Sequence, residues 1–146
     1  MFDAGMLFLH VAGAVIWNGG MLFAHQVLRP AAGPLDSAPR LALWVRVFRR
    51  FFPWVWASIA ALVSSGYIMV ASRLGGLAQV KPYVWAMQGL GLAMIVIFCW
   101  VFFRVFPALR LAAEAGLTEE GLVHLALIRR LIGINIIIGL VTIAVA

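Results

Sequence analysis

Four long apolar segments dominate this chain and restrict it to one kind of fold. They cover about residues 4–28, 53–72, 83–106 and 125–146. A helix needs about 20 mostly apolar residues to cross the hydrocarbon core of a bilayer. Backbone N–H and C=O groups in lipid must be satisfied within their own segment, so each segment is expected to be a transmembrane helix. The sequence therefore predicts an all-α integral membrane protein, with one four-helix bundle domain over residues 1–146.

The composition agrees with a membrane protein and excludes several other classes. The chain is 65% hydrophobic and 11% charged, whereas soluble domains are roughly 45–50% apolar and about 25% charged. A net charge of +6 would suggest nucleic acid as a partner of a soluble protein. Here the basic residues flank the apolar segments, so we expect membrane lipid and no nucleic acid. The single cysteine, Cys99, excludes an internal disulfide.

The basic residues are divided unequally between the two ends of the expected bundle. Arg73 and Lys81 are the two near the middle loop. The nine near the first and third loops are Arg29, Arg40, Arg46, Arg49, Arg50, Arg104, Arg110, Arg129 and Arg130. Positive loops stay in the cytoplasm. The sequence therefore predicts a multi-pass membrane protein with both termini outside.

The first loop contains an amphipathic pattern. Trp44, Val47, Phe48 and Phe51 recur at helical spacing, and three arginines take the opposite face. This pattern is typical of a short helix lying at the membrane interface. The alternative is a cytoplasmic extension of the second transmembrane helix. Several tryptophans, Trp44 among them, are also expected in interfacial belts.

The first segment carries two histidines, and ionisable residues inside a membrane span are candidates for function. His10 and His25 are 15 residues apart, or about 22 Å along a helix axis. They cannot share one metal ion and so mark two layers. Met6, Met69 and Met87 are expected near the outer layer with His10. Thioether and imidazole ligands suit Cu(I), although methionines also fill gaps in apolar cores.

The inner layer contains His25 and His124, which are expected near the same membrane face. Two histidines on facing helices of a bundle can hold one haem iron. The alternative is that both are interfacial residues whose polar tips reach water. Met6, His10 and Trp17 share one stripe of the first segment at helical spacing. Stacking of Trp17 on a flat cofactor is one interpretation, and core packing is the alternative.

The sequence offers no catalytic set. It contains no carboxylate pair or phosphate-binding loop, and all acidic residues lie outside the apolar segments. An enzymatic role would therefore depend on haem, as in a membrane oxidoreductase.

Parts of the chain resemble the copper resistance protein D (CopD) family. The resemblance rests on Leu9-His10, Trp17-Asn18-Gly19-Gly20, Phe23, Leu28-Arg29-Pro30, Phe48-Arg49-Arg50-Phe51, Ser65-Gly66, Arg129-Arg130-Leu131, Asn135 and Gly139-Leu140. It implies an inner-membrane protein linked to copper uptake or tolerance, with His10 as its transmembrane histidine. Full-length copper resistance proteins of this type are larger and have additional spans. The resemblance therefore implies that any transport path through this shorter chain is supplied by an oligomer. A periplasmic copper donor or acceptor is a further expected partner.

The chain also resembles, more distantly, the HemJ-type protoporphyrinogen oxidases, which share a histidine in the first helix and bind b-type haem. Their pattern has Lys-Leu at the start of the third helix and a histidine later in it. Here Lys81 precedes Pro82 and the third segment has no histidine. Copper handling is thus the first functional hypothesis. Haem binding through His10, or through His25 and His124, is the second, and a structural or assembly role is the third.

Overall fold

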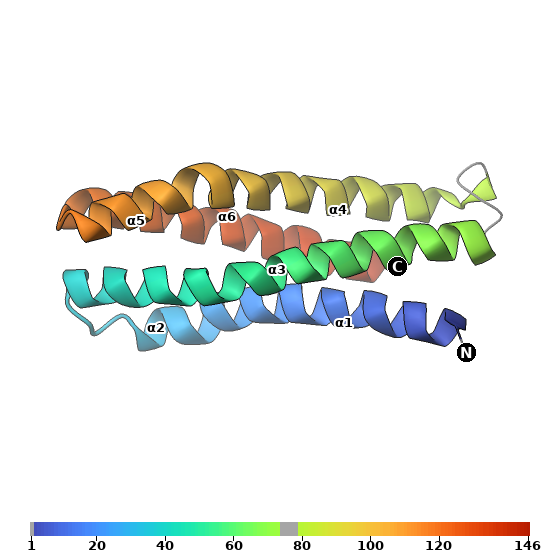
Figure 1. The fold of residues 1–146 in the computed structure, drawn as a ribbon, viewed down its shortest axis with the longest axis horizontal. Helices are drawn as coiled ribbons and strands as arrows, with labels where there is room; N and C mark the ends of the chain where they lie inside the picture. The colour runs from blue at the N-terminus through green and yellow to red at the C-terminus, as the bar shows by residue number, and fades with distance from the viewer. Residues whose placement is uncertain (1, 74–78) are drawn as a thin grey trace.

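The protein is a bundle of four long helices, each antiparallel to the next one along the chain (Figure 1). A computed structural model describes residues 2–73 and 79–146. The first long helix comprises α1 (Phe2–Phe23), a wider π-helical turn η1 (Ala24–Leu28) and α2 (Arg29–Ala31). The second is α3 (Ser37–Arg73). No strand occurs within these described ranges, so the predicted all-α four-helix membrane fold is confirmed.

The third long helix also has three parts, and the fourth is uninterrupted. The third contains α4 (Pro82–Trp100), a second π-helical turn η3 (Val101–Val105) and α5 (Phe106–Glu114). The fourth is α6 (Thr118–Val145). All four are long and apolar enough to cross a membrane.

The two π-helical turns share a cause. Each ends two residues before a proline, Pro30 in one case and Pro107 in the other. A proline has no N–H, and its ring collides with the carbonyl group four residues earlier. In both cases the N–H of the residue just before the proline donates to the carbonyl oxygen five residues back instead of four. Arg29 donates to Ala24, and Phe106 donates to Val101.

The first loop does not form a separate interfacial helix. Residues 37–52 are the first turns of α3, which continues through Pro53 without a break. The extension of the second transmembrane helix is therefore the correct one of the two alternatives. The apolar face of this segment packs into the bundle: Trp44 and Phe48 are 2% and 1% exposed. Trp44 is thus a core residue, and the prediction that it lies in an interfacial belt is wrong.

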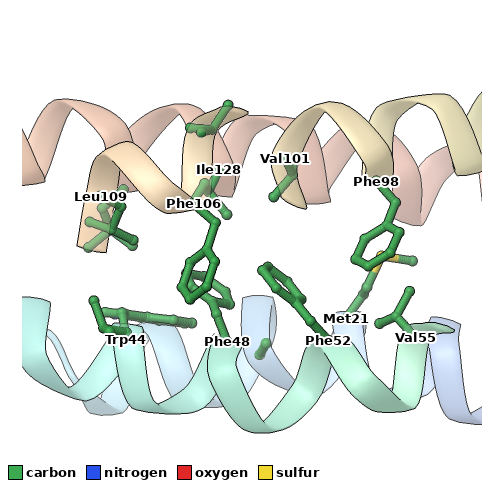
Figure 2. Close-up of a cluster of buried hydrophobic side chains, with 14 of the residues drawn as sticks. Met21, Trp44, Phe48, Phe52, Val55, Phe98, Val101, Phe106, Leu109 and Ile128 are labelled. Atoms are coloured by element: carbon green, nitrogen blue, oxygen red, sulfur yellow. The ribbon is translucent and has the colours of Figure 1, made fainter. Parts of the chain in front are cut away.

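Aromatic rings fill the space between α3 and the helix formed by α4, η3 and α5 (Figure 2). Phe52 of α3 stacks on Phe48 at 5.4 Å between ring centroids and meets Phe98 and Phe106 edge-on at 5.5 and 5.0 Å. These large side chains keep the helix backbones apart. By contrast, α1 and α3 approach closely, since a Cβ atom at Gly13 would lie 3.2 Å from the carbonyl oxygen of Ser58.

The nine arginines all lie in the half of the bundle that ends at residues 33–36 and 115–117, and Lys81 lies at the other end. Helix α3 has 37 residues, or about 55 Å at 1.5 Å per residue, which exceeds a hydrocarbon core of about 30 Å. If residues 53–72 span the membrane, the preceding turns of α3 project beyond it at the arginine-rich end. The side chain of Arg73 lies outside the described part of the structure.

Candidate metal centre

His10 lies at the contact between α1 and α3, against two small residues of α3. Its Nδ1 atom is 3.0 Å from the hydroxyl oxygen of Ser65. Gly66 makes room for the ring, because a Cβ atom there would lie 3.3 Å from Cε1 of His10. Ser65 is completely buried, and His10 is half-buried. The imidazole is therefore held in one place by the neighbouring helix.

The hydrogen bonds of Ser65 define which nitrogen of His10 carries the proton. The Ser65 hydroxyl donates to the carbonyl oxygen of Ala61 in its own helix. A hydroxyl group has one hydrogen, so towards His10 it acts as an acceptor. This geometry assigns the N–H of a neutral His10 ring to Nδ1 and the lone pair to Nε2. Histidines that bind metals typically donate their other ring N–H in this way.

Two methionines lie one helical turn further towards the Lys81 end. Helices α1 and α3 are antiparallel, and His10 is opposite Ser65. The residue four positions before His10 therefore lies at the same depth in the bundle as the residue four positions after Ser65. These residues are Met6 and Met69, both half-buried. One imidazole and two thioethers thus come from adjacent turns of two contacting helices.

Met87 shares this depth on α4. Trp17 of α1 meets Phe98 of α4 edge-on, with ring centroids 6.2 Å apart, and these two helices run in the same direction. Met6 precedes Trp17, and Met87 precedes Phe98, by the same eleven residues. Trp17 itself is 3% exposed and belongs to the core, as the packing alternative proposed.

His25 and His124 do not lie opposite each other. His25, in η1, faces Gly133 of α6, where a Cβ atom would be 3.6 Å from its Cε1. Gly133 follows His124 by nine residues, about 14 Å along the helix axis. The Nε2 atom of His124 is instead 3.8 Å from Oε1 of Glu120, one turn earlier in α6. The structure thus separates the two residues that the sequence grouped as an inner layer.

Met21 is a core residue at 3% exposure, and Cys99 is a half-buried free thiol. Within residues 4–72 and 79–146, no three His, Cys, Asp or Glu side chains gather as a metal-binding group. The candidate set at the depth of His10 is of another kind, with one imidazole and methionine thioethers.

Ser65 is the residue of this centre that the sequence did not reveal. A serine in an apolar helix normally bonds to its own backbone, and Ser65 does so. Its second role depends on which residue of α1 lies opposite. The neighbouring Ser64 makes the same bond within its own helix, to Ala60, and is exposed. The only local signal was the small pair Ser65-Gly66, which allows another helix to approach.

Four apolar helices joined by short connections define a multi-pass helical membrane protein. The family model described as copper resistance protein D matches residues 45–146, which is more than half of the chain. The protein therefore belongs to the copper resistance protein D family and is, in that general sense, a copper-resistance membrane protein. No curated protein and no solved structure matches the chain.

The matched range begins within α3 and includes Ser65, Met69 and Met87 but not α1. The resemblance of the first helix to the family is therefore supported by its residues from Leu9-His10 to Leu28-Arg29-Pro30 and not by the family model.

Proposed function

We propose that this protein binds Cu(I) as its cargo, with Nε2 of His10 and the sulfur atoms of Met6 and Met69 as ligands. Met87 is the candidate for a further thioether from α4. Cu(I) is a soft ion and prefers sulfur ligands, with imidazole also suitable. Family membership supports an association with copper in general, and the ligand set is our inference from the residues around His10.

The hydrogen bond from His10 to Ser65 is the observation that carries this proposal. It leaves Nε2 unprotonated and fixes the plane of the ring before any ion arrives. An imidazole inside a membrane segment without a role would more simply be replaced by an apolar residue, because its burial has a cost. Here a buried serine and a glycine of the next helix accommodate it.

The proposed site lies in the half of the bundle away from the nine arginines. By the positive-inside rule that half faces outward from the inner membrane. Copper would therefore enter from the periplasmic side, where a soluble donor or acceptor protein could exchange it with Met6 and Met69. A second copy of the chain is proposed to complete any path across the membrane.

The test is a metal analysis of the detergent-purified protein after loading with Cu(I), compared with His10→Ala. We expect near-stoichiometric copper in the wild type and most of it lost in the variant. The matched control is His25→Ala, which removes a histidine of the same helix about 22 Å away along its axis. It should retain copper.

The same samples separate the alternatives. An absorption spectrum before and after dithionite would show a Soret band if the protein binds b-type haem. Such a band with stoichiometric iron would replace copper binding by a haem function. Protein with neither metal, after loading, would favour a structural or assembly role.

A further inference from the structure

A second polar site lies at the opposite end of the bundle, between the first, second and fourth long helices. It is a pocket of about 350 Å³ lined by His25, Arg29, Pro30, Gly33, Arg40 and Arg129. Three of these residues are arginines that come from three different helices: α2, α3 and α6. Like charges repel at short range, so their convergence calls for an explanation.

Neutral groups position two of these guanidinium groups. Arg40 donates from Nη1 to the carbonyl oxygen of Gly33 at 3.3 Å and from Nη2 to the hydroxyl of Ser37 at 3.4 Å. Arg129 lies over the ring of Trp44, 5.2 Å from its centroid. These contacts orient the side chains but leave their positive charge uncompensated.

Carboxylates do not provide the compensation. Among residues 4–72 and 79–146, no Asp or Glu oxygen lies within 4.0 Å of Arg29, Arg40 or Arg129. Asp36 is one turn before Arg40, whose backbone N–H donates to the carbonyl oxygen of Asp36, but the Asp36 carboxylate makes no ion pair with Arg40. Glu114 pairs with Arg110, and Glu120 with His124. The Nε atoms of Arg40 and Arg129 are buried and have no acceptor in the described structure. A buried donor without a partner is costly, more so on a charged group.

The position of the pocket along the helices suits the depth of lipid headgroups. A span of about 20 residues crosses the hydrocarbon core, so a helix that enters near Ala4 leaves it near Phe23. The next two turns contain His25 and Arg29. Basic pockets between transmembrane helices on the cytoplasmic side are suited to anionic lipid headgroups, and arginine matches phosphate oxygens with paired N–H donors.

We propose that this pocket binds a phosphate-bearing anion through Arg29, Arg40 and Arg129. The phosphate oxygens accept hydrogen bonds from the guanidinium groups, and the anion joins the first, second and fourth long helices at the cytoplasmic end. The ligand is either the headgroup of an anionic phospholipid or a free phosphate. This site is separate from the proposed copper centre and does not depend on it.

The experiment measures thermal unfolding of the full chain in detergent, after its lipids have been washed away. The probes are inorganic phosphate, phosphatidylglycerol and phosphatidylcholine, each compared with sodium chloride at equal ionic strength. A ligand that binds only the folded state raises its melting temperature. We expect phosphatidylglycerol or phosphate to raise it by several degrees, and phosphatidylcholine or chloride to raise it little.

Variants show whether the pocket is responsible. Arg40→Gln and Arg129→Gln should lose most of the ligand-induced rise. Arg46→Gln removes one charge from the exposed face of α3 and should keep it. If a buried variant does not fold, Arg29→Gln takes its place, because Arg29 is exposed and its replacement disturbs less packing.

The outcomes are distinct. A rise with phosphatidylglycerol alone identifies the ligand as a lipid headgroup, and a rise with inorganic phosphate alone identifies a free phosphate. A rise with both shows that the phosphate group itself is recognised, whichever source carries it. No rise above chloride would overturn the proposal. Equal losses in Arg46→Gln and Arg129→Gln would also overturn it, since they would indicate only a general effect of net charge.

Discussion

The Nδ1 atom of His10 and the hydroxyl oxygen of Ser65 lie 3.0 Å apart and join α1 to α3 inside the bundle. Through this bond Ser65 of α3 favours the tautomer of His10 that leaves Nε2 for the proposed Cu(I) ion. The bond also depends on the packing of the two helices, because Gly13 and Gly66 bring them close enough for it to form.

The first prediction concerns this bond. Ser65→Ala should lower the affinity for Cu(I) by roughly tenfold or more, the usual effect of losing a partner behind a metal-binding histidine. Without Ser65, Nδ1 loses its acceptor and the ring can adopt the other tautomer. Affinity is measured by competition with a chromogenic Cu(I) chelator.

Ser64→Ala is the matched control, because Ser64 makes the same bond to its own helix but is exposed. It should bind copper as the wild type does. Equal affinities in Ser64→Ala and Ser65→Ala would show that the tautomer of His10 is irrelevant.

A second prediction concerns the contact between α1 and α3. A Cβ atom at Gly20 would overlap the ring of Phe51, whereas one at Gly19 would meet nothing within 4 Å. Gly20→Ala should therefore destabilise the fold by about 1–3 kcal/mol, the usual cost of overpacking. Gly19→Ala should be neutral or slightly stabilising, since alanine favours helix more than glycine does.

Both glycine variants are compared by melting temperature in the same detergent. Equal melting temperatures for Gly19→Ala and Gly20→Ala would contradict the close packing of α1 against Phe51.

The aromatic core provides a third prediction. Phe52 is 3% exposed and contacts rings of α4 and α5, whereas Trp54 is 60% exposed on the outside of α3. Phe52→Ala should cost about 3 kcal/mol, the lower end of the range for buried phenylalanines, because lipid is itself apolar and the loss is mainly one of packing. Trp54→Ala should cost much less.

Unfolding of the two aromatic variants is followed by the loss of helical circular dichroism on heating. A greater loss of stability in Trp54→Ala than in Phe52→Ala would place the core on the wrong face of α3.

The orientation in the membrane is the subject of a fourth prediction. Nine arginines lie at one end and Arg73 and Lys81 at the other, which predicts that the arginine-rich end faces the cytoplasm. Alkaline phosphatase, which is active only outside the cytoplasm, should be active when fused after Ala146. The same reporter fused after Leu35, in the first connection, should be inactive. The reverse pattern would invert the sides assigned to both proposed sites.

The sequence predicted the four transmembrane helices because hydropathy and segment length are local properties. It also placed His10 and Met6 on one stripe of α1, since helical spacing alone fixes which residues share a face. For the first loop it found the right apolar face at Trp44 and Phe48. It could not decide whether that face meets lipid or protein, because both are apolar surroundings.

Only the tertiary structure decided how the helices are set against one another. Periodicity gives the face of a helix but not its register against a neighbour, which depends on where small residues such as Gly13 and Gly139 admit close contact. That register brings Ser65 to His10 and keeps His25 away from His124. It also gathers Arg40 and Arg129, which are 89 positions apart in the sequence, around one pocket.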